Sequence, residues 1–108
     1  MELRQIRQQL TQVGLIIHRA TQALRSDKAA PQELIDHVQR LDQQSQQAQE
    51  TVQYAQDAEL LKQYLVEMEQ TSDRANQACE NARDLGAQAK SAVQFAHQEV
   101  SSLKYRLH

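Results

Sequence analysis

The sequence predicts an all-α fold, an antiparallel, coiled-coil-like helical bundle, and three observations lead to this prediction. The 108 residues are rich in strong helix formers such as Ala, Leu, Gln and Arg. They include one Pro and two Gly, and the sequence lacks the β-branched runs and turn motifs that strands require. Apolar residues recur at alternating intervals of three and four along most of the chain, the heptad pattern of packed helices. Because a chain of this length folds as one unit, we expect a single helical domain over residues 1–108.

The first helix is predicted from seven apolar positions that form one seam. Leu15 and Ile16 widen the apolar stripe beside this seam, as expected for a helix in a bundle of three or more. The pattern stops before Pro31, which suits the first position of a new helix, and Glu33 places an acidic residue in its first turn. The sequence therefore predicts a helix boundary at 26–31. The seam consists of Leu3, Ile6, Leu10, Val13, Ile17, Ala20 and Leu24.

Two further seams follow this boundary. The third begins one residue out of phase with the second, after a slip at Gln56-Asp57 that indicates a turn or a local change of supercoil. The second seam comprises Leu34, Val38, Leu41, Ser45, Ala48, Val52 and Ala55. The third comprises Ala58, Leu61, Leu65, Met68, Ser72, Ala75, Cys79, Ala82, Gly86, Ala89, Val93, Ala96, Val100, Leu103 and Leu107.

Two positions inside the third seam compete with residue 57 as the second chain reversal. Thr71-Ser72-Asp73 is a run of poor helix formers, each of which caps helices well. Gly86 is the residue type that most often terminates a helix, and it follows Asp84-Leu85. The sequence leaves the second reversal open between residues 57, 71 and 86.

The match of large against small residues on opposing seams favours reversals at residues 28 and 71, and hence three long helices. Residues 58–85 would then project as a hairpin, and Leu3 and Leu107 would lie about 30 Å apart. The alternative is a four-helix up-down bundle with reversals at 28, 57 and 85, in which Leu3 and Leu107 are neighbours. A long helix that pairs only in an oligomer is a third possible arrangement.

Residue types that carry catalysis or metal binding lack the spacing that such chemistry needs. No Glu stands three residues before a His, as the di-iron sites of helical bundles require. Cys79 falls on the third seam among alanines, as expected for a small buried thiol. Gly14 and Gly86 stand alone, so neither belongs to a phosphate-binding loop. We therefore expect no enzymatic activity, no catalytic or metal-binding residues and no cofactor.

The charge and the hydropathy of the sequence limit which classes of partner and which cellular compartment we expect. A net charge of −2 offers no basic footprint for a nucleic acid. No apolar run approaches the roughly 18 residues of a transmembrane span, and the first residues lack the apolar core of a secretory signal. A single cysteine favours a reducing compartment. We expect a cytoplasmic protein with no transmembrane segment and no nucleic-acid partner.

These observations predict a non-enzymatic interaction or assembly module that acts as a homo-oligomer, most simply a dimer. In the three-helix arrangement the projecting hairpin leaves part of its seam uncovered, and off-seam apolar residues flank it. One alternative is a signalling or regulatory coiled coil that presents a helical face to a heterologous protein. Another is a small-ligand or metal carrier in the bundle core. The expected oligomer interface comprises Leu60, Leu61, Leu65, Val66 and Met68.

Overall fold

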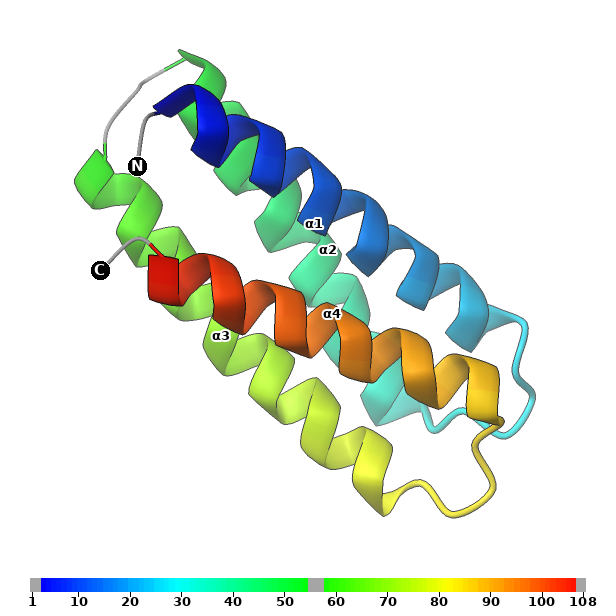
Figure 1. The fold of residues 1–108 in the computed structure, drawn as a ribbon. Coiled ribbons are helices and arrows are strands. Elements are labelled where there is room, and N and C mark those ends of the chain that lie inside the picture. Colours follow the sequence, from blue (N-terminus) through cyan, green and yellow to red (C-terminus); the bar gives the residue numbers. More distant parts are fainter. Residues whose placement is uncertain (1–2, 55–57, 107–108) are drawn as a thin grey trace.

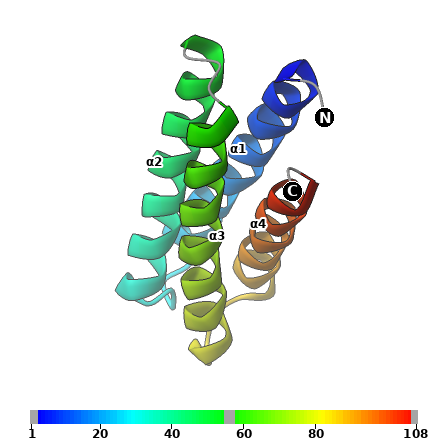
Figure 2. The same ribbon diagram turned by 90° about the vertical axis from the view of Figure 1, so that its left-hand side faces the viewer.

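In the part of the chain that the structure describes, four antiparallel helices form an up-down-up-down bundle (Figure 1). The computed structural model describes residues 3–54 and 58–106. Each helix packs against its neighbours in the chain, and the last helix closes the bundle against the first. Figure 2 shows α2 and α3 side by side, with α1 and α4 across the bundle from them. The all-α class is confirmed, and the arrangement is the four-helix alternative. The helices are α1 (Leu3–Arg25), α2 (Gln32–Tyr54), α3 (Ala58–Asn81) and α4 (Ala87–Arg106).

The expected arrangement of three long helices is therefore wrong, because the chain does not reverse at residue 71. Thr71 and Ser72 lie inside α3 and are buried. The Thr71 hydroxyl donates a hydrogen bond to the carbonyl oxygen of Glu67 at 3.0 Å. The Ser72 hydroxyl donates to the carbonyl oxygen of Glu69 at 2.9 Å. Because these hydroxyls find partners within their own helix, residues that often cap helices continue this one.

The chain reverses at other places. The predicted boundary at 26–31 separates α1 from α2, and residues 82–86 separate α3 from α4. The predicted slip at Gln56-Asp57 lies outside the described residues, between α2 and α3. Because α4 runs back beside α1, it ends at the same end of the bundle at which α1 begins (Figure 1). The expected separation of about 30 Å between Leu3 and Leu107 involves a residue, Leu107, that lies outside the described residues.

One seam from each helix forms the core. The predicted first seam is buried from Ile6 to Leu24, and Leu15 beside it is exposed. The buried apolar residues are Ile6, Leu10, Val13, Ile17, Ala20, Leu24, Leu34, Val38, Leu41, Ala48, Val52, Leu61, Leu65, Met68, Ala75, Cys79, Ala89, Val93, Ala96, Val100 and Leu103.

The bundle consists of two hairpins with equivalent cores. The first hairpin is α1–α2 and the second hairpin is α3–α4. Each helix of the second hairpin begins 55 residues after its counterpart in the first, and buried positions recur at the same offset. The hairpins are thus related as the two halves of a pseudo-twofold pair. The equivalent buried pairs are Ile6/Leu61, Leu10/Leu65, Val13/Met68, Ile17/Ser72, Ala20/Ala75, Leu24/Cys79, Leu34/Ala89, Val38/Val93, Leu41/Ala96, Ser45/Val100 and Ala48/Leu103.

The equivalent positions differ in size in a complementary way. At the end of the bundle with loops 26–31 and 82–86, the first hairpin contributes Leu24 and Leu34 to the core, and the second contributes Cys79 and Ala89. Two layers further in, large Ile17 and Leu41 of the first hairpin correspond to small Ser72 and Ala96 of the second. Large side chains of one hairpin therefore fill the space that small side chains of the other leave.

Candidate interaction surface

Polar contacts hold the two helices of each hairpin in register. In the second hairpin, His97 Nε2 lies 2.6 Å from Asp73 Oδ1, and Lys104 Nζ lies 2.8 Å from Glu69 Oε1. In the first hairpin, His18 Nδ1 lies 3.5 Å from Asp42 Oδ2. These ionisable side chains therefore contact each other between the two helices of one hairpin.

Gly14 allows α1 and α2 to approach closely. A Cβ at this position would lie 3.1 Å from Ser45 Oγ and would collide with the end of the Gln49 side chain. The Gln49 amide donates to Ser45 Oγ at 3.2 Å and so fills the space beside the glycine. Gly14, which belongs to no phosphate-binding loop, thus has a packing role between the two helices, as an isolated glycine on a helix face predicts.

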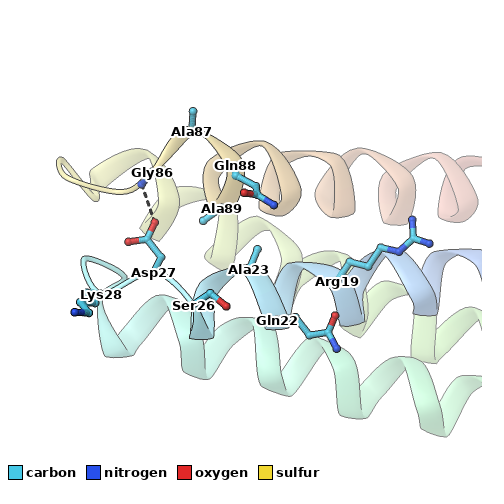
Figure 3. Close-up of a pocket in the computed structure, with 10 residues that line it drawn as sticks. All are labelled: Arg19, Gln22, Ala23, Ser26, Asp27, Lys28, Gly86, Ala87, Gln88 and Ala89. Atoms are coloured by element: carbon cyan, nitrogen blue, oxygen red, sulfur yellow. Dashed lines mark hydrogen bonds between the residues drawn. The ribbon is translucent and has the colours of Figure 1, made fainter.

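An open pocket of about 620 Å³ lies where loop 26–31 meets the start of α4 (Figure 3). Asp27 Oδ2 accepts a hydrogen bond from the Gly86 backbone N–H at 2.8 Å, and Asp27 Oδ1 accepts one from the Ala29 N–H at 2.9 Å. The carboxylate thus sits at the positive end of the α4 dipole, where an anion is stabilised. In Figure 3 the guanidinium of Arg19 lies away from this contact. The pocket therefore surrounds the contact between Asp27 of the first hairpin and Gly86 of the second. The Asp27 carboxylate is the anion that occupies the start of α4.

Cys79 lies in the core, as its place on the seam predicts. Burial raises the pKa of its thiol, Lys90 opposes this shift, and Glu80 adds to it. Its Sγ lies 3.9 Å from the Lys90 carbonyl oxygen across the second hairpin. A protonated, enclosed thiol of this kind is a poor nucleophile.

Neither a cluster of metal ligands nor a membrane-spanning helix is found among the described residues. Among residues 3–54 and 58–106, no three His, Cys, Asp or Glu side chains gather as metal ligands would. None of the four described helices combines the length and the apolar composition that crossing a bilayer requires.

The structure separates the five residues of the expected interface into two groups. Leu61, Leu65 and Met68 are buried in the core of the bundle, because α2 and α4 both pack against α3 and cover the seam that a three-helix arrangement would leave open. Leu60 is partly exposed, and Val66 is 36% exposed. A second copy packed against the closed bundle can thus contact Leu60 and Val66, and the interface itself stays a prediction.

Exposed apolar and aromatic residues occur on the first half of α3 and on the adjoining ends of two other helices. We call the partly exposed residues Leu60 and Val66 of α3 the α3 surface. Tyr54 closes α2 and Tyr105 lies in the last turn of α4, and both side chains are about four-fifths exposed. A shallow groove of about 340 Å³ runs beside Val66. The groove is lined by Glu59, Lys62, Gln63, Val66, Glu67 and Gln70.

Comparisons with protein-family models, with curated proteins and with solved structures find no match to this chain.

Proposed function

We propose that this chain is a non-enzymatic protein–protein interaction module that assembles with a second copy of itself through the α3 surface. The observation that carries the proposal is the exposure of Val66 beside a groove on α3 after the bundle has buried its own seams.

Charged side chains of both signs line the groove beside Val66, and Lys62 Nζ lies 3.7 Å from Glu59 Oε1 of the same helix. Lys62 and Glu67 lie on the same groove and carry opposite charges. In an antiparallel twofold pair of α3 helices, Lys62 of each copy faces Glu67 of the other, so that the surface complements itself. Val66 then lies near the twofold axis, where covering the 36% of it that is exposed contributes about 0.5–1 kcal/mol.

Sedimentation equilibrium at micromolar concentrations tests the proposal. We expect a reversible dimer that Val66→Glu weakens about tenfold or more, because a charge replaces an apolar contact. Leu15→Glu is the matched control, since it places the same charge at an exposed aliphatic position on α1. Leu65→Glu is unsuitable, because a carboxylate in the core would unfold the single chain.

Two outcomes would contradict the proposal. One is a monomer at every concentration, which would direct attention to a heterologous partner. The other is an equal loss of dimer in Val66→Glu and Leu15→Glu, which would show that the added charge acts through general repulsion and not at the α3 surface.

A further inference from the structure

The two hairpins repeat a short run of sequence as well as a core pattern. Residues 19–23 read Arg-Ala-Thr-Gln-Ala, and residues 74–78, at the same offset of 55, read Arg-Ala-Asn-Gln-Ala. The Arg and the Gln of each run are exposed, whereas the buried residues that follow, Leu24 and Cys79, differ from each other. Substitutions at exposed positions change stability little. The repeated Arg and Gln therefore indicate a role in binding and not in packing.

Both runs line pockets at equivalent places in the bundle. Arg19 and Gln22 line the pocket of about 620 Å³ between α1 and the start of α4 (Figure 3). Arg74 and Gln77 line a second open pocket, of about 500 Å³, between α3 and the start of α2. Because α1 and α4 lie across the bundle from α2 and α3, the two pockets lie on opposite sides of the molecule (Figure 2).

The two arginines are available to a ligand. In the part of the chain that the structure describes, neither Arg19 nor Arg74 forms an ion pair. The guanidinium of an arginine presents a planar fork of N–H groups that matches the two oxygens of a carboxylate. Gln22 and Gln77 follow three residues later, on the same side of each helix, and their amides add further N–H donors. Each pocket thus offers a charged fork beside a neutral donor.

The charges of the pockets favour a carboxylate as the ligand. The first pocket contains Arg19 and Lys28 against Asp27, whose carboxylate already accepts two backbone N–H groups. The second contains Arg74 against Glu33. With histidine neutral, the first pocket has an excess of one positive charge and the second has none. Such surroundings suit a carboxylate, with its single charge, better than a phosphate group, which carries about two.

We propose that each pocket binds a carboxylate of an acidic peptide segment, so that one bundle holds two such segments of a partner protein on opposite sides. The Arg of the repeated run binds the carboxylate, and the Gln donates a hydrogen bond beside it. The inference goes beyond the function proposed above. Both pockets lie at the end of the bundle with loops 26–31 and 82–86, whereas the α3 surface lies on the first half of α3.

A titration followed by NMR of the side-chain amide groups tests each pocket separately. Hexaglutamate is the probe, and hexalysine is the control peptide of opposite charge. We expect hexaglutamate to shift the amide signals of Gln22 and Gln77, with the smaller dissociation constant at Gln22, whose pocket has the excess positive charge. Arg19→Gln should raise the constant at Gln22 about three- to fivefold and leave that at Gln77 unchanged, and Arg74→Gln should do the reverse.

Two further variants separate binding in the pockets from general attraction of charge. Arg40→Gln is the matched control, since it removes the same charge from an exposed position of α2 that lines neither pocket. Glu33→Gln gives the second pocket the residue type that Gln88 supplies to the first, and should lower the constant at Gln77 toward that at Gln22.

The proposal is overturned if hexaglutamate shifts neither amide signal or only one of the two. It is overturned equally if Arg40→Gln weakens binding as much as the pocket variants do, or if hexalysine produces the same shifts as hexaglutamate.

Discussion

Among single residues, Cys79 shows most directly how burial changes chemistry. Its thiol is enclosed in the core layer of Leu24, Leu34 and Ala89. Desolvation raises its pKa above the ordinary 9.0, because the interior stabilises the neutral thiol more than the thiolate. The native chain therefore keeps a proton that the unfolded chain releases as the pH rises through 9.0.

This difference predicts a pH dependence of stability. Above 9.0 the unfolded state binds fewer protons than the folded state, so the free energy of unfolding falls as the pH rises. The stability that Cys79 contributes is fully present below 9.0 and is lost toward its raised, folded pKa. Urea melts of the wild type and of Cys79→Ser, under reducing conditions, should show the wild type losing stability more steeply on this alkaline side. An equal pH dependence in both proteins would show that the thiol is not desolvated.

Among the helices, the important property is the match between large and small core residues. Leu24 on α1 and Ala89 on α4 belong to the same core layer of two packed helices. Leu24→Ala should cost about 2–5 kcal/mol, because it leaves a cavity. Ala89→Leu should cost about 1–3 kcal/mol, because it overfills the layer.

Combined, these two substitutions restore the volume of the layer. We expect Leu24→Ala/Ala89→Leu to be more stable than the sum of the single costs predicts, with a coupling of about 0.5–3 kcal/mol. Leu10→Ala/Ala89→Leu is the control, since Leu10 occupies a layer near the other end of α1, and its costs should simply add. Urea denaturation of the five variants and the wild type measures both cycles. Equal coupling in the two cycles would show that the layers are assigned incorrectly.

For the whole molecule, the decisive feature is the closure of α4 against α1. It brings the start of α1 beside the end of α4 (Figure 1), where the three-helix arrangement would separate them by about 30 Å. The packing of α3 against both α2 and α4 places Leu61, Leu65 and Met68 in the core of one chain.

Spin labels on exposed Gln5 and Ser102 test this closure directly. Their helices pack side by side, so the axes should be about 10 Å apart and the labels should give a short distance. Labels on Gln5 and Gln88 should give a longer distance, because Gln88 lies about 20 Å farther along α4. Both pairs are placed in a Cys79→Ser chain and diluted with unlabelled protein. A longer distance for Gln5/Ser102 than for Gln5/Gln88 would refute the four-helix arrangement.

The seams of the helices could be predicted from the sequence alone, because heptad periodicity is a local property. It predicted the all-α class, the buried residues of α1 from Ile6 to Leu24 and the buried position of Cys79. The boundary at 26–31 was also predictable, since Pro31 acts on the backbone of its immediate neighbours.

The number of helices and the candidate surface were decided by tertiary structure. Residues 57, 71 and 86 carry local break signals of similar strength, and only the packing of α4 on α1 shows that the hydroxyls of Thr71 and Ser72 stay inside a helix. A comparison of the sequence with itself at an offset of 55 residues would have pointed to this arrangement, because equivalent seam positions recur there. The junction of Asp27 and Gly86 has no local signal, since 59 residues of sequence separate its partners. Local patterns select which face of a helix is buried, whereas the contacts between distant segments select which helix covers it.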